Sequence, residues 1–382
     1  MISKTILAVA ALVLVFQADL TTSIDFNKGI LGTAANVVQA HVNVGEKLIT
    51  NLPVLIPSFS EIGEFGKQSL LGYPFEAVAL GIHQFCSAAV ATNGTTPRIE
   101  PDLSRMSYLL LSDQGNFSFP LSNAADLWSS PYFAKDLKTV ILVTGWLSTI
   151  EDPNLAVDTI YQAYRTRGGV NFVVIDTVAQ LNTLYSWSAF NTNSLGESLG
   201  DGLIELANYV PLESIHLIGH SLGAHVSGAA GRRFQEQKGV NLPRITGLDP
   251  ANPCFNEGET LSGLSRGDAN LVDIIHSNVR VLGKRDPIGD IDFYPNGLNS
   301  IQPGCYTVVC SHSRAWEYYA ESVLPGNEGN FIAVKCNGLS ALISGLCRRQ
   351  TATMGYNVSR NTKGNFFLRV NSASPYGKKK KF

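Results

Sequence analysis

The chain has 382 residues, of which 45% are hydrophobic and only 16% are charged. This composition excludes a disordered chain, and the length exceeds that of one small domain. The net charge of −2 excludes the strong positive field of a nucleic-acid-binding protein, so we expect no nucleic-acid partner.

Residues 1–23 are typical of a secretory signal peptide. Lys4 precedes the uncharged apolar run 6–16, which is too short to span a bilayer, and small residues follow at Ala18 and Ser23. We therefore expect a secreted, extracellular protein. The sequons for N-glycosylation fit that compartment and lie at Asn93, Asn116 and Asn357.

Six cysteines in an oxidising compartment predict up to three disulfides. Proximity favours pairing Cys305 with Cys310 and Cys336 with Cys347, which leaves Cys86 and Cys254 to pair by elimination. Other connectivities stay open, because spacing alone does not fix the pairing. The cysteines lack the spacing of a zinc site, so we expect no zinc.

Four regions follow one another along the chain. The signal peptide is followed by an N-terminal extension, 24–98, whose helical patterns are broken by Pro53 and Pro57. Strand and helix patterns alternate in 99–374, which predicts an α/β domain with a mainly parallel central sheet. A basic tail, 375–382, ends the chain. The expected strands are 108–112, 140–143, 172–175, 215–218, 244–248 and 366–370, and the expected helices are 194–209, 222–234 and 314–322.

Three segments match the pattern Gly-x-Ser-x-Gly, centred on Ser198, Ser221 and Ser265. A nucleophile elbow needs a buried strand before the serine and a helix after it, whose amides point at the developing oxyanion. Ser221 has both, the strand 215–218 and the helix 222–234. Ser198 falls inside a predicted helix and Ser265 inside a predicted loop. Ser221 is therefore the predicted nucleophile of a serine hydrolase.

A nucleophilic serine needs a histidine base and a carboxylate that orients the histidine. In this kind of fold the three residues follow in the order serine, acid, histidine. Asp249 directly follows the strand 244–248 and is the predicted acid. Asp268 and Asp273 are expected to be surface or capping groups.

Two histidines follow Asp249 in the chain, His276 and His312. His276 ends an apolar run, and we expect a structural role for it at the end of a strand. His312 comes just after Cys310, and we expect it on a loop that the Cys305–Cys310 bridge anchors. His312 is therefore the predicted general base.

The oxyanion hole needs two backbone N–H groups. Leu222 follows the nucleophile and is expected to supply one of them. The other is expected from Trp146, in the loop after the strand 140–143. His220 and His225 flank the elbow and are expected to pack behind the site rather than to act on the substrate.

Together these segments resemble the pancreatic lipase family of secreted α/β-hydrolases. The resemblance implies an α/β-hydrolase fold, the catalytic triad and the oxyanion hole at the residues named above, and it supports the two near cysteine pairs. The matching segments run in family order across about residues 105–370: VTGW (143–146), GHSLGAHVSG (219–228), GLDPANPCF (247–255), DIIHSN (273–278), DFYPNG (292–297), QPGC (302–305) and CSHSRAWEYYAES (310–322).

The chain departs from the triacylglycerol lipases of that family. Four residues, YTVV (306–309), stand where those lipases have a long lid, and the loop between His276 and Asp292 is also shortened. Because few residues follow His312, we expect no C-terminal β-sandwich domain of the kind found in that family. Charged calcium ligands are mostly absent: Asp268 remains, while Thr260, Gly263 and Ser265 stand at the other positions.

These departures predict an open site with room for a polar head group, which resembles phospholipase A1 enzymes. We expect cleavage of the sn-1 ester of phospholipids at a membrane or lipid–water interface, with no metal, no cofactor and no colipase. Triacylglycerol or galactolipid is the alternative substrate. An alternative of another class is a non-catalytic lipid-binding or storage protein that resembles insect yolk proteins. Such proteins commonly lack the triad serine, whereas all three triad positions are filled here.

Overall fold

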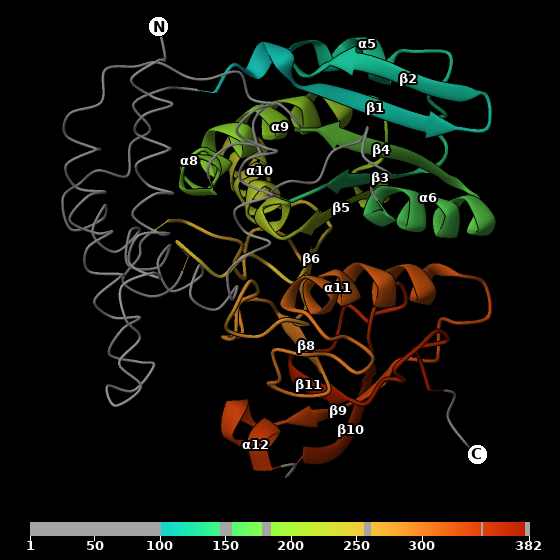
Figure 1. Ribbon diagram of the computed structural model, residues 1–382. Coiled ribbons are helices and arrows are strands. Elements are labelled where there is room, and N and C mark those ends of the chain that lie inside the picture. Colours follow the sequence, from blue (N-terminus) through green and yellow to red (C-terminus); the bar gives the residue numbers. More distant parts are fainter. Residues whose placement is uncertain (1–100, 146–154, 178–184, 256–260, 345–346, 379–382) are drawn as a thin grey trace, which may run out of the picture. The chain divides into compact units, whose positions relative to one another are not determined.

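The computed structural model describes residues 101–145, 155–177, 185–255, 261–344 and 347–378 (Figure 1). The predicted signal peptide and the N-terminal extension lie outside these residues, as do Cys86, Asn93 and Trp146. The described residues fall into two compact units. The smaller unit contributes helix α8 (Tyr185–Phe190) and residues 253–255 and 261, and the larger unit holds the rest.

The larger unit is built on one 11-stranded sheet, counted over the described residues, in the order β10-β9-β11-β8-β7-β6-β5-β3-β4-β1-β2. Neighbouring strands are parallel from β11 through to β4, whereas β1 and β2 at one edge and β9 and β10 at the other pair antiparallel. The strands are β1 (Ser107–Ser112), β2 (Gly115–Pro120), β3 (Lys138–Val143), β4 (Val170–Asp176), β5 (Ile215–His220), β6 (Arg244–Leu248), β7 (Val272–Ile275), β8 (Ile291–Pro295), β9 (Ile332–Cys336), β10 (Cys347–Thr353) and β11 (Gly364–Leu368).

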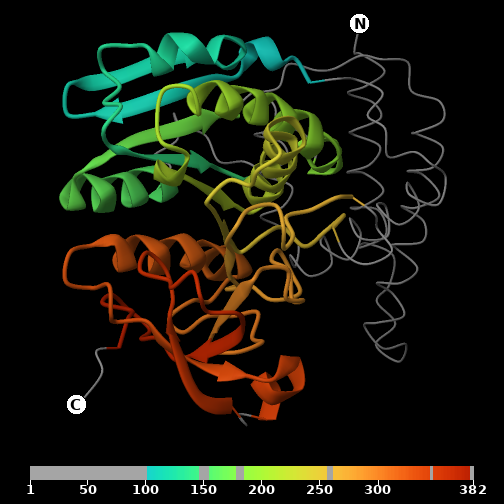
Figure 2. The ribbon, with the colours of Figure 1, turned by 180° about the vertical axis from the view of Figure 1, so that it is seen from behind.

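Helices cover both faces of this sheet (Figure 1), and Figure 2 shows the same layers from behind. One face packs against α6 (Leu155–Arg167) and α11 (Val308–Val323). The other face packs against α10 (Leu222–Lys238), which lies along α9 (Thr192–Leu206), and α9 in turn contacts α5 (Ala124–Trp128). Helix α12 (Gly338–Ser344) contacts β9 and β11. Short 3₁₀ helices lie at Leu103–Arg105, Leu121–Asn123 and Leu212–Ser214.

The central strands are apolar on both faces, as expected of parallel strands between two helical layers. Residues 139–143 of β3 are all buried, and so is every residue of β7 and β8. The predicted α/β-hydrolase fold with a mainly parallel sheet is therefore confirmed. Among the described residues, no helix is long and apolar enough to cross a membrane.

Most of the predicted helices and strands are present, but several begin or end at residues other than those expected. The helix expected over 194–209 ends at Leu206, and the helix expected over 222–234 continues to Lys238, where Gly239 ends it with a left-handed φ of 70°. The strand expected over 366–370 covers Gly364–Leu368 instead. Strands β2, β8, β9 and β10 and helices α5, α6, α8 and α12 had no counterpart among the elements expected from the sequence.

Candidate active site

Ser221 occupies the sharp turn between β5, which ends at His220, and α10, which begins at Leu222. Its φ of 56° and ψ of −123° lie in a region that residues other than glycine rarely adopt. The Ser221 N–H donates to the carbonyl of Leu248 at 3.1 Å, and the Ser221 carbonyl accepts from the N–H of Ala224 at 3.1 Å. These bonds hold the serine in the strained geometry of a nucleophile elbow.

The glycines around Ser221 are required by close backbone approach. A Cβ atom at Gly219 would collide with the backbone of Ala224, and one at Gly223 would collide with the backbone at the end of β3. A Cβ atom at Gly145, just after β3, would lie 2.5 Å from the Cβ of Ser221. The Gly-x-Ser-x-Gly pattern is therefore explained at this position by sterics.

The other two Gly-x-Ser-x-Gly segments, centred on Ser198 and Ser265, do not lie at a turn from a strand to a helix. Gly196 and Gly200 lie on α9, where a Cβ atom would collide with Ala229 or with Arg233 of α10. These glycines let the two helices pack closely, and Ser198 lies between them inside α9. Ser265 lies in a loop, where its N–H donates to the carboxylate of Asp268 at 2.9 Å.

Asp249 directly follows β6 and is fully buried. Its Oδ2 atom accepts from Nδ1 of His312 at 2.5 Å, and its Oδ1 atom accepts from the N–H groups of Ser277 at 2.7 Å and Asn278 at 3.0 Å. A carboxylate can only accept, so the His312 proton lies on Nδ1 and leaves Nε2 free to act as a base. A Cβ atom at Gly283 would collide with this carboxylate.

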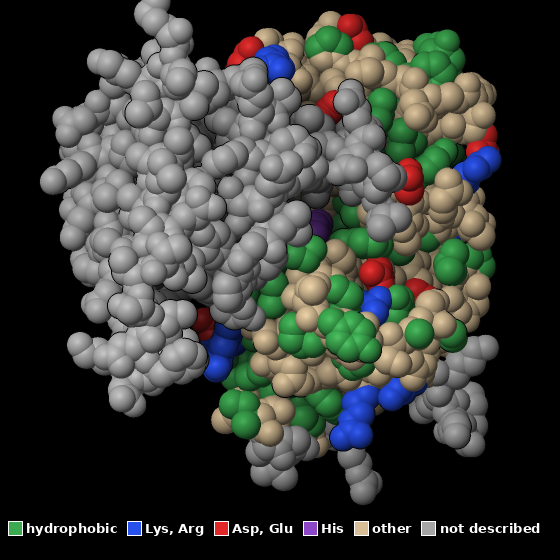
Figure 3. Space-filling view, viewed as in Figure 1, with side chains coloured by type: hydrophobic (Ala, Val, Ile, Leu, Met, Phe, Trp, Pro, Cys, Tyr) green, Lys and Arg blue, Asp and Glu red, His purple; other side chains and the backbone are tan. Residues whose placement is uncertain are grey.

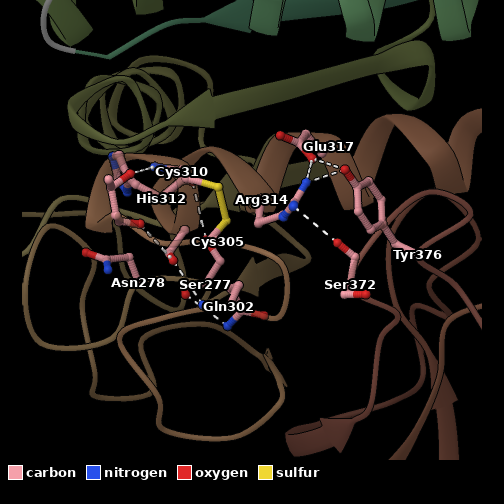
Figure 4. The surroundings of a disulfide bond; sticks show 12 residues. Ser277, Asn278, Gln302, Cys305, Cys310, His312, Arg314, Glu317, Ser372 and Tyr376 are labelled. Carbon is pink, nitrogen blue, oxygen red and sulfur yellow. Dashed lines mark hydrogen bonds and ion pairs between the residues drawn. A yellow bond between two sulfur atoms is a disulfide. The ribbon is translucent and has the colours of Figure 1, made fainter.

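His312 lies inside helix α11, so the prediction that it precedes the helix on a loop is wrong. The helix begins at Val308 because Thr307 caps it: the Thr307 hydroxyl accepts from the Cys310 N–H at 3.1 Å. The disulfide between Cys305 and Cys310 spans this helix start (Figure 4). His312 is thus fixed by a capped and cross-linked first turn.

Ser221 and His312 are positioned by different elements. The N–H of Ser221 binds the carbonyl of Leu248, the residue before Asp249, and Asp249 binds His312. Among the described residues, the Ser221 hydroxyl makes no hydrogen bond to the His312 ring. Catalytic hydrogen bonds are often long in the absence of substrate.

His220 packs beside the base. The centroid of its ring lies 4.6 Å from that of His312, at an interplanar angle of 41°. Burial, together with the nearby His312 ring, lowers the pKa of His220 well below its usual range, so His220 stays neutral. Within the described residues neither of its ring nitrogens has a hydrogen-bond partner. This arrangement fits the packing role expected for His220.

Gln302 supports the site in a way that the sequence did not suggest. Its side-chain amide donates to the carbonyls of Ser277 at 2.9 Å and Pro295 at 3.0 Å, and its N–H donates to the Ser311 hydroxyl at 2.9 Å. The Tyr318 hydroxyl donates to its side-chain oxygen at 3.1 Å. One buried amide therefore ties the loop after β7 and the end of β8 to the helix that carries His312 (Figure 4).

The far end of the same helix binds the C-terminal segment. Glu321 accepts from the N–H groups of Tyr376 and Gly377, both at 2.7 Å. The Arg314 guanidinium lies over the Tyr376 ring, 4.5 Å from its centroid, and also pairs with Glu317 (Figure 4). The first residues of the predicted basic tail are thus bound to α11.

One of the two predicted oxyanion-hole residues, Leu222, lies within the described residues. Leu222 is the first residue of α10, so its N–H is among those that a helix leaves unpaired at its start. Trp146 lies outside the described residues. The role of both N–H groups stays a prediction.

The alternatives to Asp249 and His312 have structural partners. His276 is fully buried; its Nε2 lies 2.9 Å from Oδ1 of Asp292, and its Nδ1 lies 2.8 Å from the carbonyl of Lys284. This is the structural role expected for His276. The expectation that Asp273 is a surface or capping group is wrong, because it is fully buried and binds the Arg244 guanidinium at 2.8 and 2.9 Å.

Asp268 is also buried rather than superficial, and it binds the Arg232 guanidinium at 2.8 Å. It therefore already has a cationic partner. Among the described residues, no group of three or more His, Cys, Asp or Glu side chains could hold a metal ion.

The structure contains the two cysteine pairs expected from proximity, Cys305–Cys310 and Cys336–Cys347. Cys254 is also disulfide-bonded, and its expected partner, Cys86, lies outside the described residues. Two of the three sequons lie within the described residues, and both asparagines, Asn116 and Asn357, are exposed.

A model of the family described as Lipase matches residues 87–376. Vitellogenin-3 of Drosophila melanogaster is 40% identical over 210 residues, which cover 55% of this chain and 50% of that protein. Lipoprotein lipase of Rattus norvegicus is 32% identical over 285 residues, which cover 66% of this chain and 59% of that protein.

The chain thus spans about half the length of the vitellogenins it matches. Among solved structures, a hyperthermophilic esterase from Pyrobaculum calidifontis aligns with 55% of this chain and 57% of its own, at 13% identity and a TM-score of 0.25. A likeness that weak supports no argument about function.

Proposed function

This chain belongs to the pancreatic lipase family, and on that basis we propose that it is a secreted serine esterase that cleaves acyl esters of glycerolipids. The observation that carries the proposal is the buried Asp249–His312 pair at the carboxyl end of the sheet, next to the strained turn at Ser221. Backbone strain of this kind persists only where the surrounding structure enforces it, and it is typical of active sites.

The proposed mechanism assigns one role to each group. The Ser221 hydroxyl attacks the ester carbonyl while Nε2 of His312 takes its proton, and Asp249 stabilises the imidazolium that forms. The N–H groups of Leu222 and Trp146 stabilise the oxyanion. His312 returns the proton to the leaving alcohol, and an acyl-enzyme remains on Ser221. A water molecule, deprotonated by His312, then releases the fatty acid.

The short loop between Cys305 and Cys310 supports a phospholipid as the preferred substrate, cleaved at its sn-1 ester. Helix α11 begins at Val308, so little free chain remains within the disulfide to fold over the site. Tyr306 in the loop is 96% exposed and Val309 in the first turn of α11 is 46% exposed, so this segment presents apolar surface to its surroundings. Tyrosine is favoured at membrane interfaces, which suits an enzyme that works on a lipid surface.

Two observations support an extracellular protein. Disulfides form and persist in oxidising compartments, and the structure describes two of them. Asn116 and Asn357 are exposed, as glycosylation requires. On the face in Figure 3, acidic and basic groups are both present and the described surface is otherwise largely uncharged, which does not favour a nucleic-acid partner.

The 40% identity to a vitellogenin favours one second candidate, a lipid-binding or storage protein without activity. A storage protein has no need of a strained serine or of a histidine oriented by a buried carboxylate. We therefore rank it below the esterase.

The test compares the wild type with the variant Ser221→Ala on phosphatidylcholine vesicles and on triolein emulsions. The proposal predicts fatty-acid release from phosphatidylcholine that depends on Ser221. The absence of any serine-dependent release would support the storage protein, and release from triolein alone would contradict the phospholipid preference.

A further inference from the structure

His225 lies on α10, four residues after Ser221, and its side chain is fully buried. Its Nε2 atom lies 2.8 Å from the carbonyl oxygen of Ala251. Its Nδ1 atom accepts a hydrogen bond from the N–H of Leu264 at 2.9 Å. One imidazole thus binds two segments, which follow it in the sequence by 26 and 39 residues.

These two bonds require one protonation state of the ring. A carbonyl can only accept, so Nε2 of His225 carries a proton, and a backbone N–H can only donate, so Nδ1 carries none. Burial lowers the pKa of His225 to about 3, and the positive charges of Lys284 and Arg232 act in the same direction. The ring is therefore a neutral imidazole at every pH at which the protein is expected to work.

The first segment that His225 binds is the one that carries the catalytic acid. Ala251 lies two residues after Asp249, and its N–H donates to the Ser221 carbonyl at 3.2 Å. Through Ala251, this segment is thus hydrogen-bonded to Ser221 at the nucleophile turn and to His225, one helical turn further along α10. Asp249 has a φ of 43°, so its backbone depends on its surroundings to hold this conformation.

The second segment is the loop 262–268, which lies against the same face of α10. Seven residues after His225, the Arg232 guanidinium donates to the carbonyls of Ser262 and Gly263, both at 3.1 Å, and to Asp268 at 2.8 Å. Gly228 lies between His225 and Arg232 on α10, and a Cβ atom there would lie 2.8 Å from the Cα of Leu264. The loop therefore packs closely on the helix and holds the Leu264 N–H at the His225 ring.

We propose that His225 is a positioning residue for the triad: as a neutral imidazole protonated on Nε2, it fixes the segment that carries Asp249 to the helix that begins at Ser221. The inference rests on the proposed function, because it concerns the same reaction. His225 acts through Asp249 and Ser221 and does not touch the substrate.

The test compares three variants of the full chain with the wild type, on a soluble short-chain ester. His225→Leu removes both hydrogen bonds, His225→Gln can both donate and accept, and Arg232→Met loosens the loop without touching the bond to Ala251. Thermal unfolding, kcat, KM and the pH profile of kcat/KM are measured for each.

We expect His225→Leu to lower kcat by about 10- to 100-fold, because a small misplacement of catalytic groups has effects of that size. We expect KM to change by less than about twofold, and His225→Gln to recover most of the lost kcat, as predicted for a residue that acts through geometry. Arg232→Met is expected to lower the unfolding temperature while kcat stays within about threefold of the wild type. A folded His225→Leu protein with wild-type kcat would overturn the proposal, as would an equal loss of kcat in Arg232→Met.

A second measurement is independent of catalysis. In protein labelled with ¹⁵N-histidine, NMR should show the His225 ring, identified by its loss in His225→Gln, as the neutral tautomer protonated on Nε2. A ring protonated on Nδ1, or a charged ring at neutral pH, would overturn the proposal even if the wild type proved inactive. A wild type without serine-dependent esterase activity would refute the proposed function instead.

Discussion

Nδ1 of His312 lies 2.5 Å from Oδ2 of Asp249, and the same carboxylate accepts from the N–H groups of Ser277 and Asn278 just after β7. The acid is thus held by the sheet, and the base is oriented by the acid. His312 approaches from α11, whose first turn is fixed by the Thr307 cap and by a disulfide. The position of the His312 ring therefore depends on Asp249 on one side and on the capped, cross-linked first turn of α11 on the other.

The first prediction concerns the tautomer of His312. Asp249→Asn replaces an acceptor by an amide that can present its NH₂ group, so the ring is no longer held with its proton on Nδ1. We expect kcat to fall by about 10⁴-fold, as for the same change in other triads. Steady-state kinetics on a soluble ester measure this. A loss of less than about tenfold would show that Asp249 does not orient the base.

The second prediction concerns the disulfide before His312. Replacing Cys305 and Cys310 by serine should destabilise the fold by about 2 kcal/mol through loop entropy, and it should lower kcat because the first turn of α11 loosens. Replacing Cys336 and Cys347 by serine is the control. That variant should lose about 3 kcal/mol of stability and keep its kcat. Equal effects of both double variants on kcat would contradict a local role for the first bridge.

The third prediction concerns the buried ion pair between Asp273 and Arg244. Asp273→Asn leaves the guanidinium without its carboxylate and should destabilise the protein by about 3 kcal/mol in urea unfolding. Asp113→Asn breaks the pair with Arg165 at the surface, where the two side chains are 71% and 52% exposed. That control should change stability by less than about 1 kcal/mol. Similar losses in both variants would mean that burial does not set the strength of these pairs.

The fourth prediction concerns acid stability. His225 has a folded-state pKa of about 3, whereas in the unfolded chain its pKa is about 6.5. Between these values the unfolded chain binds a proton that the folded protein does not, so the contribution of His225 to stability is complete above pH 6.5 and is lost as the pH falls toward 3.

From pH 7 to pH 4.5, the wild type should therefore lose about 2.5 kcal/mol more stability than His225→Gln, which has no such group. Urea unfolding at the two pH values measures the difference. Equal losses in the two proteins would show that His225 takes up its proton while folded.

The sequence located the candidate triad because two of its members directly follow strands. Ser221 directly follows β5 and Asp249 directly follows β6. Both strands are visible in the sequence as apolar runs, and a parallel sheet brings the carboxyl ends of its strands together. The environment of His312 was not predicted, although Thr307 is a residue type that commonly caps a helix.

The remaining errors come from buried polar residues. Asp292 interrupts the apolar pattern of β8, and its partner, His276, directly follows a different strand, β7. Asp273 looks like a surface residue until Arg244 is placed beside it on the neighbouring strand. Pairings of this kind depend on strand order, which local patterns do not encode.

The central claim is that Ser221 is a nucleophile activated by His312 and Asp249. The most direct measurement is covalent labelling of the full chain by a fluorophosphonate, with the modified residue located by mass spectrometry. The account predicts one adduct on Ser221, no adduct in Ser221→Ala, and labelling at least about 100-fold slower in His312→Gln, because the hydroxyl is a poor nucleophile without its base. Labelling of the folded wild type at Ser198 or Ser265, or no labelling at all, would contradict it.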